Sequence, residues 1–288
     1  MTMEQLSSQA QKVIDQYLNL KIGEKNITTP YFNNRRKNIR GALRVLIGKG
    51  SPEDIAEEAT IFSLREKIKL AELNAEQIKK FLIEHNLGID CSGLIYHVLD
   101  TELKARNLGG LKKYIHRPWI KNPIRKLISQ FRSAENTGVS TFNNNINSKE
   151  INLKDIQPGD LIVMMGAGPK QDYNHVLLVS SVIPSRNEVE DTRKGGSLSN
   201  SSNNVNSNTT FNTQKRDSSP SGFGIVIEYT HSFQYPTDGL YNHGVRQETI
   251  TITDPNKNLL EQNWSEPQMQ EYAKKAKEIF IRRLKALV

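Results

Sequence analysis

Hydrophobic residues recur every three or four positions through the first hundred residues, which is the spacing of amphipathic helices. The sequence Ser51-Pro52-Glu53-Asp54 is a strong helix start, because serine caps a helix, proline suits its first position and acids favour its positive end. Gly88 is a stop signal before a further helix that begins at Cys91. The pattern therefore predicts four helices, over about 4–20, 51–69, 74–87 and 91–107.

The second half of the chain changes to short apolar runs bounded by turn residues, which is typical of buried strands. The turn signal Pro158-Gly159 precedes the first of these runs. The predicted strands cover 161–165, 174–182, 223–232 and 244–252. Residues 265–288 predict a basic amphipathic helix at the C-terminus. Helices followed by strands predict an α+β fold with an antiparallel sheet.

Two polar stretches interrupt this pattern. Residues 184–221 are rich in Ser, Asn and Thr, so they bury too little apolar surface to offset ordering entropy and are predicted to be disordered. Residues 104–132 carry nine basic residues, no acid and three aromatics, which fits a patch for an anionic polymer or a solvated insertion. Residues 133–149 are Asn/Ser-rich and are predicted to be mobile. The predicted organisation is an N-terminal helical region (1–74), a main domain (75–264) with insertions at about 109–150 and 184–221, and the C-terminal helix (265–288).

Composition narrows the setting of the chain. The net charge of +8 favours anionic partners such as nucleic acid, wall polymer or a membrane surface. One cysteine in 288 residues excludes internal disulfides. The sequence has no apolar run long enough to span a membrane. Residues 1–20 lack the layout of a secretion signal, so a cytoplasmic location is expected unless another export route operates. A monomer is expected.

The single cysteine stands in the segment Gly88-Ile89-Asp90-Cys91-Ser92-Gly93. Asp90 and Ser92 are good helix caps, so Cys91 is expected in the first turn, where the helix dipole favours a thiolate. Gly88 and Gly93 leave room for another backbone or a substrate. The alternative is that Cys91 is a small buried hydrophobe.

A cysteine nucleophile needs a base within hydrogen-bond reach and a third group that orients the base. His97 follows Cys91 on the same helix and is too far along it, and His85 is expected to cap a helix end. His116 lies in the basic insertion. His175 opens a predicted core strand, where a loop meets rigid structure, and is the best candidate base.

The order of three motifs resembles the NlpC-type cysteine peptidases of the papain-like superfamily. The three motifs are Asp90-Cys91-Ser92-Gly93-Leu94-Ile95, Pro158-Gly159-Asp160-Leu161 entering a strand, and His175-Val176 opening the next strand. The resemblance covers about residues 75–183 and 223–252. It implies a papain-like core in which Cys91 attacks a peptide amide, His175 acts as the base and a polar residue on the next strand orients His175. Many members of that family cut peptidoglycan stem peptides, and relatives include amidases and acyl-transfer enzymes.

Two residues compete for the orienting position. Ile225, Ile227, Tyr229 and His231 share one face of the predicted strand, and Glu228 lies on the other face. Because the first face is more apolar and is expected to be core, Glu228 is preferred and His231 is the alternative. A carboxylate would hold the imidazole tautomer of His175.

Asp90, Ser92 and Tyr31 are the candidate substrate-binding residues. In some members of the resembled family the residue at Asp90 holds a substrate amine, although a capping role is equally open. Tyr31 corresponds to a tyrosine upstream of the cysteine, but the following Trp-Gly-Gly is absent. No metal-ligand spacing or phosphate loop is found, so no cofactor is expected.

The sequence thus predicts a thiol hydrolase acting on peptidoglycan-type peptides. The alternatives are a non-catalytic module of the same fold that binds an anionic polymer, and an acyltransferase or amidase.

Overall fold

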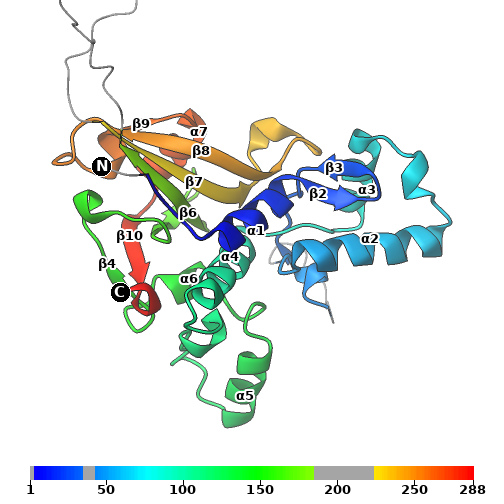
Figure 1. The fold of residues 1–288 in the computed structure, drawn as a ribbon, viewed down its shortest axis with the longest axis horizontal. Helices are drawn as coiled ribbons and strands as arrows, with labels where there is room; N and C mark the ends of the chain where they lie inside the picture. Colours follow the sequence, from blue (N-terminus) through cyan, green and yellow to red (C-terminus); the bar gives the residue numbers. More distant parts are fainter. Residues whose placement is uncertain (1–2, 35–42, 185–223) are drawn as a thin grey trace, which may run out of the picture.

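The computed structural model describes residues 3–34, 43–184 and 224–288. Apart from its first residue, the predicted disordered insertion at 184–221 lies outside the described residues. The fold is α+β, with helices packed against an antiparallel sheet, as predicted (Figure 1). Within the described ranges, no helix is both long and apolar enough to cross a membrane.

The sheet has eight strands in the order β4-β10-β5-β6-β7-β8-β9, and β1 pairs with β6. All of these pairings are antiparallel. The strands are β1 (Glu4–Gln5), β4 (Ser148–Glu150), β5 (Leu161–Ala167), β6 (Tyr173–Pro184), β7 (Ile225–Phe233), β8 (Gly244–Ile252), β9 (Asn263–Trp264) and β10 (Glu278–Leu284). A separate hairpin is formed by β2 (Leu20–Ile22) and β3 (Lys25–Ile27).

Helices cover both faces of the sheet, and the alternation of side chains along the central strands explains why. Leu161 and Val163 of β5 join the core formed with α1 and α4, whereas Ile162 and Met164 join the core that includes α7. The central strands are therefore apolar on both faces. The helices are α1 (Ser8–Leu18), α2 (Pro52–Glu66), α3 (Ala75–Glu84), α4 (Cys91–Ala105), α5 (Pro123–Phe131), α6 (Val139–Phe142) and α7 (Pro267–Lys274).

The prediction of a C-terminal helix over 265–288 is wrong beyond Lys274. The chain leaves α7 and forms β10, which lies between β4 and β5 and pairs with both. The spacing of apolar residues suits a helix there, but the run Ile279-Phe280-Ile281 also suits a strand. Arg283 of β10 also forms an ion pair with Asp160 at 2.7 Å, and Asp160 is 1% exposed. Pairing on both edges decides in favour of the strand.

Residues 133–149 were predicted to be mobile, and this prediction is also wrong. The segment contains α6 and enters β4, and Asn147 and Ser148 are buried. Asn147 donates to the carbonyl oxygens of His116 and Thr141, and Ser148 donates to that of Phe142. The polar side chains therefore order the segment by satisfying its own backbone.

Candidate functional site

Cys91 is the first residue of α4, as the capping pattern predicts. Asp90 is the N-cap, and its Oδ1 accepts hydrogen bonds from Gly93 N–H at 2.6 Å and from Ser92 Oγ at 3.0 Å. Asp90, Cys91 and Ser92 are all buried. The helix start therefore holds the cysteine in a fixed position inside the molecule.

Backbone from other segments approaches this helix start closely, and two glycines permit the approach. A Cβ on Gly88 would lie 2.4 Å from Pro30 O, and a Cβ on Gly93 would lie 2.7 Å from Gly48 O. Ser232 at the end of β7 donates from Oγ to Ile89 O at 2.8 Å. The glycines thus make room for protein backbone, and the sheet is tied directly to the cysteine segment.

Lys49 is the cation of the site, and the sequence reasoning missed it. Its Nζ donates to Asp90 Oδ1 at 2.8 Å, to Ser92 Oγ at 2.6 Å and to Thr137 O at 2.9 Å. Lys49 is only 6% exposed. Because the side chains of Asp90 and Ser92 already bind Lys49, their first role is to hold this cation beside the cysteine. A single lysine between two glycines gives no signal in the sequence.

Burial controls the protonation of Cys91. Desolvation, and next the charge of Asp90, raise the pKa of the Cys91 thiol to about 12. The charge of Lys49 and backbone N–H groups of Val176 and Ser92, which hydrogen-bond to the sulfur, lower this pKa but do not outweigh burial. The expectation that the helix dipole would favour a thiolate is therefore not met, since the dipole acts on a desolvated group.

His175 lies at the start of β6. The next residue, Val176, is the one whose backbone N–H lowers the pKa of the Cys91 thiol. His175 Nε2 is 3.0 Å from His231 Nδ1, and His231 Nε2 is 3.0 Å from Glu266 Oε2. Tyr229 also donates to Glu266 Oε2 at 3.0 Å. Burial, and then the charge of His231, lower the pKa of His175 well below its usual value. The side chains of His175, His231 and Glu266 form a buried hydrogen-bonded series.

The carboxylate sets the tautomers along this series when both rings are neutral. Burial raises the pKa of Glu266, but its hydrogen bonds, that from His231 first, outweigh burial and hold the pKa below its ordinary value. An ionised carboxylate only accepts hydrogen bonds, so His231 carries its proton on Nε2 and accepts at Nδ1. His175 then donates from Nε2, which leaves its Nδ1 unprotonated. Glu266 had no signal in the sequence, because it lies 91 residues from His175, just after β9, which pairs with β8.

The preference for Glu228 as the orienting residue is wrong in this geometry. Ser180 and Ser181 donate to Glu228 Oε2 at 3.3 and 3.1 Å, and the carboxylate makes no hydrogen bond to His175. His231, the alternative, occupies that position. The error arises because the face of β7 that carries Tyr229 and His231 is apolar on average, yet both polar groups are satisfied there by Glu266.

A cleft of about 510 Å³ reaches the cysteine. Lys49, Asp90, Cys91 and Ser92 line it together with Trp119, Asn174 and the segment 135–141. His175 is 3% exposed and does not line the cleft, although Asn174 beside it does. Tyr31 lines a neighbouring hollow with His243 instead, and its N–H donates to His243 Nδ1 at 3.1 Å. The structure therefore places Tyr31 beside the cysteine segment but outside this cleft.

The described part of the chain contains no cluster of three or more His, Cys, Asp or Glu side chains that could hold a metal ion. The chain matches no protein-family model, no curated protein and no solved structure.

Proposed function

We propose that this chain is a cysteine-nucleophile hydrolase with a papain-like core, which cleaves an amide bond in peptidoglycan-type peptides. The observation that carries the proposal is the buried hydrogen-bonded series of His175, His231 and Glu266. The backbone N–H of Val176, the residue after His175, lowers the pKa of the Cys91 thiol, so this series begins beside the sulfur. A nucleophile, a base and an orienting group in series are what thiol catalysis requires.

In the first step, His175 Nδ1 takes the thiol proton as the Cys91 sulfur attacks the amide carbonyl carbon. The oxyanion that forms is stabilised by the Cys91 N–H at the helix start. The C–N bond then breaks, and His175 returns the proton to the leaving amine. A water molecule, deprotonated by His175, attacks the thioester and releases a carboxylic acid and the thiol. Because the resting pair is neutral, His175 acts as a general base in this step.

The substrate class rests on the three motifs around Asp90, Pro158 and His175 that resemble the NlpC-type peptidases. The cleft of about 510 Å³ is lined by polar residues of the segment 135–141, among them Asn136, Thr137 and Ser140, which could bind the backbone of a peptide.

The test is digestion of purified cell wall and of synthetic stem peptides, with products identified by mass spectrometry. We expect the wild-type protein to release fragments with a new carboxylate and a new amine. Cys91→Ala and His175→Gln should each lower the rate at least about 100-fold. His231→Gln should also lower the rate, because His231 contacts the base. Glu228→Gln is its matched control, since Glu228 makes no such contact. Equal release by the wild-type and Cys91→Ala proteins would refute the proposal.

Product analysis also separates hydrolysis from acyl transfer on the same site. If an added amine intercepts the thioester, the product is a new amide instead of a carboxylate. Cys91 and His175 would keep their roles in that reaction, so only the second step would change.

A further inference from the structure

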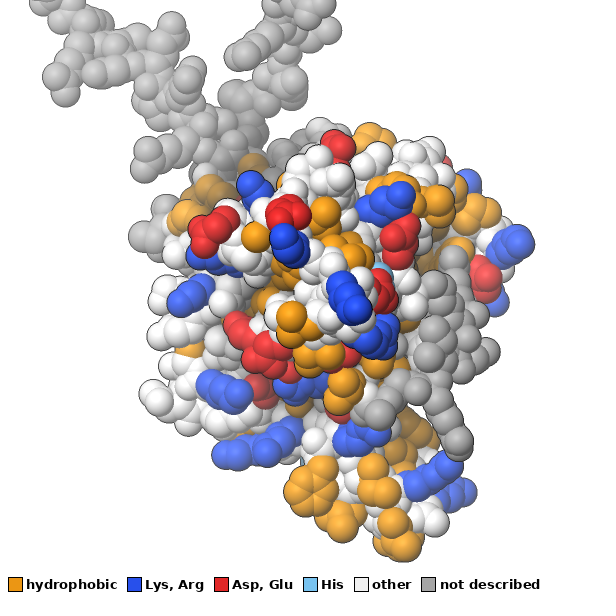
Figure 2. All heavy atoms as spheres, turned by 90° about the vertical axis from the view of Figure 1, so that its right-hand side faces the viewer, with side chains coloured by type: hydrophobic (Ala, Val, Ile, Leu, Met, Phe, Trp, Pro, Cys, Tyr) orange, Lys and Arg blue, Asp and Glu red, His pale blue; other side chains and the backbone are white. Residues whose placement is uncertain are grey.

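The helix α5 turns its apolar face outward. Only Ser129 of this helix is buried, at 3% exposed. Its large apolar residues are exposed by 50–83% and follow the spacing of one helical face: Ile124, Leu127, Ile128 and Phe131. Trp119, just before the helix, is 50% exposed. The helix lies at the lower end of the molecule in Figure 1, and hydrophobic side chains gather at that end in Figure 2.

The two ends of the segment that carries α5, residues 117 to 137, are tied to each other. Arg117 is 7% exposed and donates to Ser133 O at 2.8 Å, to Thr137 Oγ1 at 2.9 Å and to Asn136 O at 3.0 Å. These hydrogen bonds join the residues just before α5 to the residues just after it. The segment that carries the apolar face is therefore closed at its base by hydrogen bonds.

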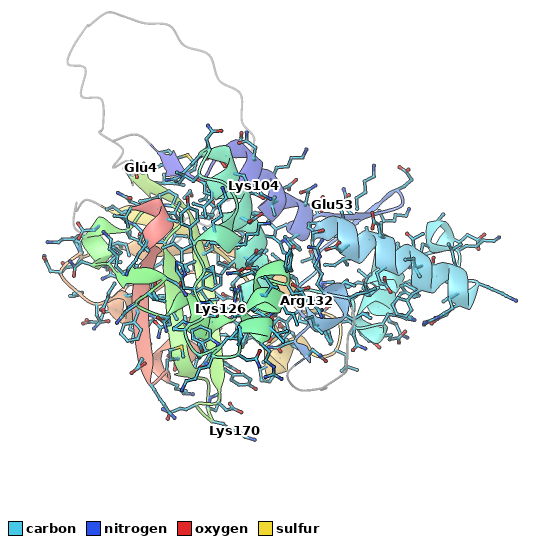
Figure 3. The ribbon with its side chains drawn as sticks, turned by 90° about the horizontal axis from the view of Figure 1, so that it is seen from below. Glu4, Glu53, Lys104, Lys126, Arg132 and Lys170 are labelled. Carbon is cyan, nitrogen blue, oxygen red and sulfur yellow. The ribbon has the colours of Figure 1, made fainter. Side chains whose placement is uncertain are left out.

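Exposed basic residues lie on α5 and in the segment before it. Four of the nine basic residues in 104–132 have structural partners: Lys104 with Asp100, Arg106 with Glu102, Arg132 with Glu135, and the buried Arg117. The other five are exposed, and no carboxylate of the described residues lies within ion-pair distance of them: Lys112, Lys113, Lys121, Arg125 and Lys126. Figure 3 views this end of the molecule from below and labels Lys126 and Arg132.

Apolar and basic groups together select the occupant. A nucleic acid would use the charges but would gain little from Leu127 and Phe131. A second copy of the chain would bring two sets of cations face to face. A bilayer with anionic headgroups takes up a convex apolar helix face and attracts the cations around it.

We propose that α5 and Trp119 dock the protein on an anionic lipid bilayer. Ile124, Leu127, Ile128 and Phe131 enter the boundary between headgroups and acyl chains, and Lys121, Arg125 and Lys126 bind lipid phosphates. Trp119 also lines the cleft at Cys91, so docking brings the mouth of the cleft to the membrane surface. The proposal rests on α5 and on Trp119 and Lys121 before it, and it does not require catalysis.

The test uses vesicles of equal parts phosphatidylglycerol and phosphatidylcholine, compared with pure phosphatidylcholine, and full-length protein carrying Cys91→Ala. The chain has two tryptophans, and Trp264 is 7% exposed, so a Trp264→Phe background leaves Trp119 as the probe. We expect a blue shift of Trp119 fluorescence and co-sedimentation with the anionic vesicles, both weakened by salt.

Two sets of variants separate the parts of the surface. Leu127→Ser with Phe131→Ser should weaken binding at least about tenfold, since each side chain loses apolar burial. The matched control is Ile61→Ser with Leu64→Ser, because these residues of α2 are 57% and 73% exposed but lie on another helix.

Replacing Lys121, Arg125 and Lys126 by Gln should weaken binding by about fivefold per residue. Lys21→Gln with Lys25→Gln on the β2–β3 hairpin is the control for charge alone.

Three results would overturn the proposal. One is that neither vesicle type binds the protein. The second is that binding depends on the basic residues but not on Leu127 and Phe131, which would indicate a purely electrostatic polyanion site. The third is dimerisation in analytical ultracentrifugation that Phe131→Ser abolishes, which would make a second copy the occupant. Since Cys91 is absent in this test, none of these results bears on the proposed hydrolysis.

Discussion

The protonation of Cys91 can be tested without knowledge of the substrate. Burial raises the pKa of its thiol to about 12, so at neutral pH the folded protein holds a thiol rather than a thiolate. Alkylation by iodoacetamide, a neutral reagent, requires the thiolate. Since Cys91 is the only cysteine in the chain, all alkylation reports on this site.

The magnitude follows from the pKa. At pH 7.5 a group with a pKa of about 12 is ionised to about 3 × 10⁻⁵, whereas an ordinary cysteine is ionised to about one tenth. The more basic thiolate is about 40-fold more nucleophilic, for a Brønsted slope of about 0.45. Alkylation of the folded protein should therefore be at least about 50-fold slower than that of the unfolded chain. Its rate should rise tenfold per pH unit from 7 to 10.

The charges beside the sulfur should shift this rate in opposite directions. Lys49→Met removes the cation that lowers the pKa of the thiol, so alkylation should slow. Asp90→Asn removes the anion that raises the pKa, and asparagine still caps a helix, so alkylation should accelerate. The assay is mass spectrometry of the intact protein at timed intervals, with a chain unfolded in guanidinium as the reference. A rate that is already constant between pH 6 and 8 would mean a thiolate–imidazolium pair and would refute the reasoning.

Three further predictions concern stability and the hydrogen-bonded series. The Cys91 thiol ionises near pH 8.5 in the unfolded chain but has a pKa of about 12 in the folded protein, so stability should fall as pH rises above about 8.5. The loss should be about 2 kcal/mol at pH 10, measured by urea titration of the wild type relative to Cys91→Ala. Glu266→Ala leaves the N–H of His231 and a tyrosine hydroxyl without an acceptor, and should cost about 2–5 kcal/mol in the same titrations, whereas a loss under about 1 kcal/mol would contradict a buried series. Gly88→Ala places a Cβ 2.4 Å from a backbone oxygen and should lower the melting temperature by several degrees, whereas Gly138→Ala meets nothing within 4 Å and should leave it unchanged.

Interactions between residues close in the chain made much of the fold predictable from the sequence. The caps at Ser51, Asn74 and Asp90 each accept a hydrogen bond from the backbone of the first helical turn, as their sequence positions predict. The apolar runs that became β5–β8 were recognisable because a strand buried on both faces is continuously hydrophobic. The helix start at Cys91 was found for the same reason, since caps and periodicity act over a few residues.

Choices between distant partners could not be made from the sequence. The apolar spacing after Lys274 suited a helix, but the gap between β4 and β5 accepted a strand. The alternation along β7 predicts which residues share a face, but it does not predict that the mostly apolar face holds the polar partner of His175. His231 is accommodated there because Glu266, 35 residues further along the chain, accepts its hydrogen bond. Lys49 was invisible for the same reason, as its partners lie 41 to 88 residues away.

By itself, then, the sequence determined the helices, most strands, the placement of Cys91 at a helix start and the choice of His175 as the candidate base. These follow from interactions between residues close in the chain. The tertiary structure alone decided that His175, His231 and Glu266 form a hydrogen-bonded series, that Lys49 pairs with Asp90 and that the cysteine is desolvated. Each depends on burial and on contacts between distant segments, which the order of residues does not encode locally.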